Sequence, residues 1–239
     1  MRRVLDLIER RTGDLAGEAF YGFLRDRSVD PRERLAFAPA ILHFVMTFAD
    51  LYTHVLRTPQ GAEPEDDLQA LVDAHTREDD DHYRWYLADL ATLGLDAPMS
   101  LSEAARQLFG DATIETRRLS YEMCRMGLGA SSLERLVLVL CIEAAGRVSL
   151  GASAIAARDL ETRTGKRLVY FGSHHVETED NHLLWTEDVE RDLRSQELPD
   201  ERAAALSALV DRSFDLFARF AREIHAFGAS TRGRPEGTE

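Results

Sequence analysis

The sequence is poor in cysteine and proline, and each shortage narrows the kind of protein that it can encode. Only two cysteines, Cys124 and Cys141, occur among 239 residues. Both lie in apolar, helix-type surroundings, which predicts buried free thiols and argues against a Cys-rich zinc site. Only seven prolines occur, and this scarcity favours long, uninterrupted helices.

Basic residues are also in short supply. The chain has 29 Lys and Arg residues against 42 Asp and Glu residues, and its net charge is −13. Nucleic acids and anionic membrane surfaces bind basic faces of proteins. The charge balance therefore argues against both of them as partners.

Long apolar runs are missing as well. The longest purely apolar run covers residues 136–142, far fewer than the roughly 20 residues that cross a bilayer. The first nine residues mix charged and apolar side chains and lack the apolar core of a signal peptide. We therefore expect no membrane-spanning segment, and a cytoplasmic protein.

Helical periodicity is what the sequence has in abundance. Hydrophobic residues make up 44% of the chain, and their spacing follows the helical period rather than the alternation of strands. The expected helices cover residues 3–26, 31–57, 66–93, 101–109, 112–127, 132–162, 168–193 and 200–227. We expect one all-α domain over residues 1–228, a bundle of about seven main helices, and a disordered tail over residues 229–239.

Two matching motifs of metal-type ligands stand out, one hundred residues apart in the chain. Both follow the pattern H-x3-[D/E]-D-x-H-x2-W. The ligand-type residues are His75, Asp79 and His82 in the first copy, and His175, Glu179 and His182 in the second. On a continuous helix these spacings place each set on one face. Imidazole and carboxylate groups suit iron, manganese or zinc.

The length of each motif favours two metal ions over one, because seven residues rise about 10.5 Å along a helix. Glu78 competes with Asp79 as a ligand, since it also lies on the face of His75 and His82. The alternative for both motifs is a polar, solvent-facing surface without a metal.

Glu143 is a third candidate ligand. It is the only charged residue between Arg135 and Arg147, within the most apolar predicted helix. A buried carboxylate without a partner costs several kcal/mol or more. A metal ion would satisfy it, and so would Arg147 one helical turn later.

Other side chains are candidates for the wall of a substrate pocket, with ordinary core packing as the alternative. They are His43, Asp50, Tyr121, Arg147, Tyr170 and Phe171.

An apolar helix with one Glu, followed by a helix with H-x3-[D/E]-x2-H, resembles the haem-oxygenase-like di-iron oxidases and oxygenases. These share a seven-helix fold with haem oxygenase and with thiaminase-like and pyrroloquinoline-quinone-synthesis proteins. The resemblance implies ligands on a late helix, a middle helix and an early helix. In this sequence they are His175, Glu179 and His182, then Glu143, then His82.

The sequence departs from the family pattern at two positions. Glu179 stands where the family usually has Asp. His75 stands where the early helix usually has a carboxylate, so that ligand would be Asp79 or Glu78, or be missing.

The resemblance implies an enzyme that activates O2 at two iron ions, with manganese or zinc as alternatives. Its substrate would be a small amino-acid-like molecule, or another small carboxylate or amine, in a biosynthetic pathway. The expected reactions are N-oxygenation, oxidative decarboxylation, or C–C or C–N cleavage, and a homodimer is an allowed assembly. The alternatives are a metal-dependent or thiaminase-like hydrolase on the same fold, and a non-catalytic bundle that binds a ligand.

Overall fold

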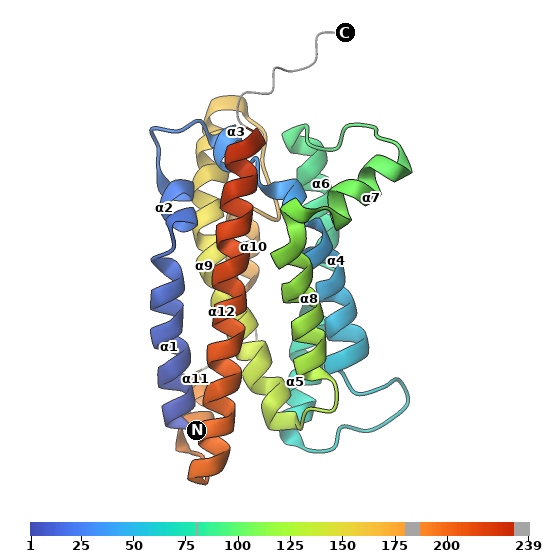
Figure 1. Ribbon diagram of the computed structural model, residues 1–239. Coiled ribbons are helices and arrows are strands. Elements are labelled where there is room, and N and C mark those ends of the chain that lie inside the picture. Colours follow the sequence, from blue (N-terminus) through green and yellow to red (C-terminus); the bar gives the residue numbers. More distant parts are fainter. Residues whose placement is uncertain (80, 180–186, 232–239) are drawn as a thin grey trace.

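A computed structural model describes residues 1–79, 81–179 and 187–231. Within these ranges the chain forms helices and no strands, so the predicted all-α class is confirmed. Figure 1 shows the helices arranged as an upright bundle. The first half of the chain forms α1 (Arg2–Ala16), α2 (Ala19–Arg25), α3 (Pro31–Arg34), the 3-10 turn η1 (Ala38–Ile41), α4 (Leu42–Asp50), the π-helix η2 (Leu51–Leu56), α5 (Asp67–Glu78), α6 (Tyr83–Leu93) and α7 (Leu101–Phe109). The second half forms the 3-10 turn η3 (Asp111–Thr113), α8 (Ile114–Gly127), α9 (Ser132–Thr164), α10 (Ser173–Glu179), α11 (Glu187–Ser195) and α12 (Asp200–Thr231).

The bundle is built around α9. This helix begins in a capping box between Ser131 and Glu134 and ends at Gly165, whose left-handed backbone closes the last turn. Residues 136–145 are buried without interruption, which means that neighbours cover this part of the helix on every side. Those neighbours are α1, α2, α3, α5, α8, α10 and α12. Any side chain in the middle of α9 is therefore held by most of the fold.

The prediction of one helix over residues 66–93 is wrong, because the structure has two helices there. α5 ends at Glu78 and α6 begins at Tyr83. The break falls in a run of four acidic residues, 78–81. Negative charge is unfavourable at the C-terminal end of a helix, and Asp is a poor helix former. The first ligand motif therefore spans a turn between helices.

Other predicted boundaries also shift. The helix expected over residues 31–57 is divided into α3, η1, α4 and η2, and Pro39, which has no N–H group, lies at the first division. The helix expected over residues 3–26 is divided at Gly17 into α1 and α2. The helix expected over residues 168–193 starts only at Ser173, and residues 180–186 lie outside the described part of the chain.

The C-terminal helix is longer than expected. α12 continues to Thr231, so residues 229–231 are helical and do not belong to an irregular tail. A Cβ atom at Gly228 would lie 3.5 Å from the backbone nitrogen of Phe37. This close packing against the start of η1 holds the last turns of α12 on the bundle. Residues 232–239 lie outside the described part of the chain.

Two stretches, Pro31–Leu56 and Ser132–Thr164, are long and apolar enough to cross a bilayer by length and composition. The sequence analysis expected no such stretch, because it counted only uninterrupted apolar runs. A helix can be apolar on average even when single polar residues interrupt it. In the second stretch 67% of the most apolar window is buried inside the protein. The apolar character of α9 is thus matched by its place at the centre of the bundle.

Leu136→Ala should lower the free energy of unfolding by about 2–5 kcal/mol, because it removes a fully buried side chain from α9 and leaves a cavity. Leu101→Ala is the matched control. Leu101 is 87% exposed at the start of α7, so its loss should change stability by no more than about 0.5 kcal/mol. Chemical denaturation of both variants measures the difference, and similar values would contradict the central position of α9.

Candidate metal centre

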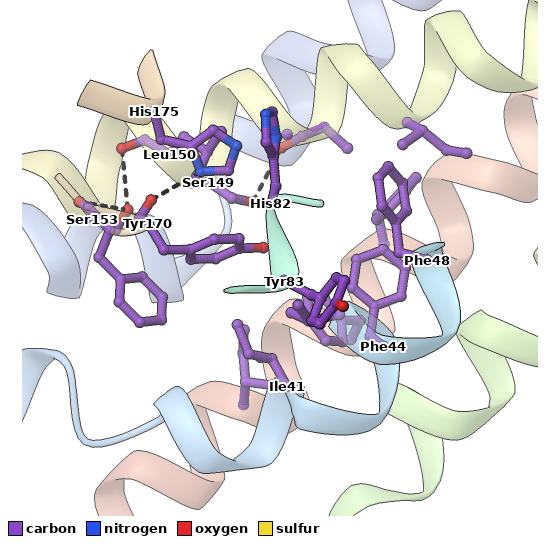
Figure 2. Close-up of a pocket in the computed structure, with 18 of the residues that line it drawn as sticks. Ile41, Phe44, Phe48, His82, Tyr83, Ser149, Leu150, Ser153, Tyr170 and His175 are labelled. Carbon is purple, nitrogen blue, oxygen red and sulfur yellow. Dashed lines mark hydrogen bonds between the residues drawn. The ribbon is translucent and has the colours of Figure 1, made fainter. Parts of the chain in front are cut away.

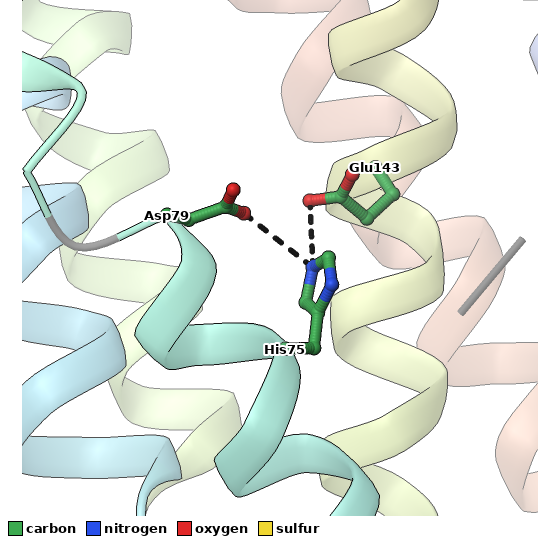
Figure 3. A group of neighbouring side chains, drawn as sticks. All are labelled: His75, Asp79 and Glu143. Carbon is green, nitrogen blue, oxygen red and sulfur yellow. Dashed lines mark ion pairs between the residues drawn. The ribbon is translucent and has the colours of Figure 1, made fainter. Parts of the chain in front are cut away.

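Three buried side chains from α5, the turn after it and α9 converge on one point. The Nε2 atom of His75 lies 3.1 Å from Oε1 of Glu143 and 3.4 Å from Oδ2 of Asp79. Figure 3 shows the imidazole ring pointing between the two carboxylates. One potential ligand atom from each residue lies within 4.8 Å of the other two. A single ion can reach all three groups.

Asp79 lies one helical turn after His75, at the point where α5 ends. Asp79 is the first residue after α5, and His82 is the last residue before α6. Both are buried. The Nδ1 atom of His82 lies 3.6 Å from Oδ1 of Asp79. The two oxygens of Asp79 therefore face two different imidazoles, that of His75 and that of His82.

His175 brings α10 to the same region. Its ring centroid lies 4.7 Å from that of His82, nearly at right angles. Its Nδ1 atom lies 2.9 Å from the backbone carbonyl oxygen of Tyr170, so Nδ1 carries the proton and donates it to this oxygen. Nε2 then keeps the lone pair that a metal ion needs.

The segment that carries Tyr170 is itself fixed by Asp89 of α6. The carboxylate of Asp89 accepts hydrogen bonds from the backbone N–H groups of Val169, at 2.8 Å, and Phe171, at 2.9 Å. Burial raises the pKa of Asp89, and these backbone donors oppose the rise. One side chain thus ties the helix that follows His82 to the segment that positions His175.

Tyr52 supports Glu143 from the π-helix η2. Its buried hydroxyl donates a hydrogen bond of 3.2 Å to Oε1 of Glu143, and its ring lies beside that of His75. π-Helical turns occur often at functional sites, because the wider turn redirects the side chains that it carries. Here the wider turn presents a hydroxyl group to a buried carboxylate.

These residues fit a metal ion. Two carboxylates and an imidazole, buried together, form a donor set that suits a first-row transition metal. Burying two carboxylates together costs several kcal/mol for each charge unless cations or hydrogen bonds compensate. The alternative partner considered for Glu143 is not in this position, since Arg147 is exposed while Glu143 faces His75 and Tyr52.

Asp79 and Glu78, the two candidate carboxylates of the first motif, lie on different sides of the His75 ring. Glu78 is 41% exposed, and its carboxylate lies 3.9 Å from Nδ1 of His75, on the opposite side of the ring from Asp79. Asp79 is the carboxylate that adjoins Glu143. In the second motif, Glu179 is the last residue of α10 but its side chain lies outside the description, as does His182 entirely.

A cavity lies against this group of ligands (Figure 2). Its empty volume is about 1000 Å³ including the part that is open to solvent, and Asp79, His82, Glu143 and His175 form part of its wall. Tyr170 and Phe171 line it as well, in the role considered for them from the sequence. Substrate-sized space therefore adjoins the potential metal ligands.

The other four pocket candidates lie elsewhere, which corrects the sequence-based assignment. Asp50 and Arg147 are exposed. His43 packs against the rings of Phe109 and Tyr121, both of which are largely exposed. Within the described part of the chain, these four residues are not in the cavity wall. The apolar helix that carries His43 and Asp50 turns other side chains inward, chiefly Phe44 and Phe48.

Sequence reasoning missed Tyr52 and Asp89, as well as the aromatic wall of the cavity. Tyr52 lies in a stretch that is apolar nearly all round, where no periodicity marks an inward face. Asp89 acts on backbone groups 80 and 82 residues later, a pairing with no local signal. The motif places a Trp three residues after its second His. In the first copy the rings of His82 and Trp85 stack, with centroids 4.2 Å apart.

No protein-family model matches the sequence, and a search of curated proteins returns no match either. The case for a function therefore rests on the geometry and chemistry of the site.

Tyr52→Phe should weaken metal binding about tenfold, because ligands that lose a supporting hydrogen bond lose affinity on this scale. Tyr86→Phe is a matched control. It also removes one buried hydroxyl, in this case a donor to the carbonyl oxygen of Ala38. Both variants should lose similar stability without metal, and titration with Fe(II) should separate them. Equal affinities would show that Tyr52 does not position Glu143.

Glu143→Gln should abolish stabilisation by metal while leaving the metal-free protein as stable as before or more stable, because it removes a buried charge. In the unchanged protein, a metal concentration of 100 times Kd should add about 2.7 kcal/mol. Thermal unfolding with and without Fe(II) or Mn(II), under anaerobic conditions, measures both effects.

Glu223→Gln is the control for this measurement. Glu223 caps the start of α8 by accepting hydrogen bonds from the N–H groups of Glu115 and Thr116. Its substitution should lower stability but keep the response to metal. A normal metal response in Glu143→Gln would remove Glu143 from the site.

Proposed function

We propose that this protein is a non-haem iron enzyme, an oxidase or oxygenase that uses O2 to oxidise a small organic substrate. The observation that carries the proposal is the place of Asp79 and Glu143. Both belong to the buried group around His75, and both also lie in the wall of a cavity large enough for a substrate.

The ligands support a pair of ions. His75, Asp79 and Glu143 form one group, and His82 and His175 lie beside it with their rings 4.7 Å apart. Asp79 adjoins both groups through its two oxygens. Two-metal sites commonly hold their ions about 3.5–4 Å apart with carboxylates between them. Glu179 and His182, which the resemblance assigns to the same centre, would complete the second group.

The protein itself supplies a shielded reaction space. When bound, a pair of ferrous ions supplies the electrons that reduce O2 during oxidation of the substrate. Tyr52 holds the carboxylate of Glu143 in place, and the carbonyl oxygen of Tyr170 orients the ring of His175. The aromatic wall of the cavity excludes water from the substrate.

The test is anaerobic loading with Fe(II), followed by exposure to O2. We expect about two iron ions per chain and an absorption change that requires O2. His82→Ala should reduce the iron content to about one ion per chain and slow the response to O2. His43→Ala is the control, because His43 lies away from the cavity, and it should keep the full iron content.

Three outcomes would contradict the proposal. A full iron content without any O2-dependent change would exclude an oxidase or oxygenase. Turnover with Zn(II) or Mn(II) that is independent of O2 would indicate the metal-dependent hydrolase instead. An unchanged thermal midpoint with Fe(II), Mn(II) and Zn(II) would indicate a bundle that holds no metal.

A further inference from the structure

The wall of the cavity is chemically divided. Its carboxylate and imidazole groups, those of Asp79, His82, Glu143 and His175, all belong to the proposed metal centre. Away from them the wall is made of apolar and aromatic side chains from several helices. They include Ile41, Phe44, Phe48, Phe217, Phe220 and Ile224. Figure 2 shows Ile41, Phe44 and Phe48 across the cavity from His175.

The described part of the wall offers no Lys or Arg side chain to a second charged group of a substrate. Among the described residues that line the cavity, none is Lys or Arg. Of the residues that the structure does not describe, residue 80 and residues 180–186 contain no Lys or Arg, whereas residues 232–239 contain Arg232 and Arg234. A carboxylate far from the metal end would lie in an apolar environment without a partner, at a high desolvation cost.

Among the described wall residues, hydroxyl groups belong to Tyr83, Ser149, Ser153 and Tyr170. The hydroxyl of Tyr83 accepts a hydrogen bond from Nε of Arg84 at 3.5 Å, and Tyr170 packs against His175 at the metal end. The two serines are already used within the protein. Ser149 donates to the carbonyl oxygen of Ala145 at 3.0 Å and also contacts the hydroxyl of Tyr21. Ser153 donates to the carbonyl oxygen of Leu150 at 3.1 Å. The two serines therefore offer a substrate little more than accepting lone pairs. An ammonium group far from the metal end would have no carboxylate among the described wall residues there.

We propose that the substrate has one polar end, which lies at the metal centre, and an uncharged apolar or aromatic body that fills the rest of the cavity. This inference rests on the proposed function, and it narrows the substrate class. Amino-acid-like or carboxylate compounds fit only when their remaining part is apolar, and molecules charged at both ends are excluded.

The test compares three probes with a chain of eight carbons: 1-octanol, and two that are charged at both ends, 1,8-diaminooctane and octanedioate. Calorimetric titration uses the full-length protein, first treated with a chelator and then loaded anaerobically with Fe(II). We expect 1-octanol to bind at least tenfold more tightly than either charged probe in both states, because a buried charge without a partner is unfavourable. Equal or tighter binding of a charged probe would overturn the inference.

Two glycines of α9 give a matched pair of variants. A side chain at Gly146 would meet no atom within 4 Å at its Cβ and would enter the cavity that Gly146 lines. Gly151 lies on the same helix, is exposed, and has equally open space at its Cβ. Both changes to Leu improve helix propensity by a similar amount. Gly146→Leu should weaken binding of 1-octanol at least tenfold, and Gly151→Leu should leave it unchanged.

The two proposals fail separately. Binding of 1-octanol that does not respond to Gly146→Leu would place the probe outside this cavity and overturn the inference, even if iron and O2 react as expected. If iron does not bind, the proposed function fails, and the assignment of the probe as a substrate mimic fails with it. The titration of the chelator-treated protein would still report which chemistry the cavity accepts.

Discussion

The structure depends on a buried carboxylate in its most apolar helix, which is energetically unfavourable unless neighbouring groups compensate for it. Glu143 is 5% exposed and lies in a stretch of α9 that is otherwise apolar. A charge there is tolerated only when neighbouring groups compensate for it. Those neighbours are His75 from α5 and Tyr52 from η2. Because α9 contacts seven other helical elements, the bundle as a whole fixes the position of this carboxylate.

The break after α5 affects how close together the donor atoms of the first motif lie. On one continuous helix, His75 and His82 would be separated by a rise of about 10.5 Å, with Asp79 between them. The break between α5 and α6 interrupts that rise, and the two oxygens of Asp79 lie 3.4 Å from Nε2 of His75 and 3.6 Å from Nδ1 of His82. The acidic run that ends the helix therefore also supplies the carboxylate that joins the two groups of imidazoles.

Spacing within the sequence was enough to predict the all-α class and the apolar helix at residues 132–162. It also placed His75, Asp79 and Glu143 among the candidate ligands, with Glu78 and Arg147 as alternatives. It could not predict that the first motif spans a turn, because the periodicity of apolar residues continues on both sides of the acidic run. Tyr52 and Asp89 were beyond reach for another reason. Their roles depend on which elements pack together, and a single sequence does not contain that information.

One face of α9 carries both the proposed ligand and the floor of the cavity. Glu143, Gly146, Leu150 and Ser153 follow one another at helical spacing and all line the cavity. Small side chains after Glu143 leave space where larger ones would fill it. Along the helix, Ser153 lies about 15 Å from Glu143. The same helix thus sets the position of the proposed metal ligand and the length of the apolar space beyond it. The position of the reactive end and the size of the substrate therefore depend on one element.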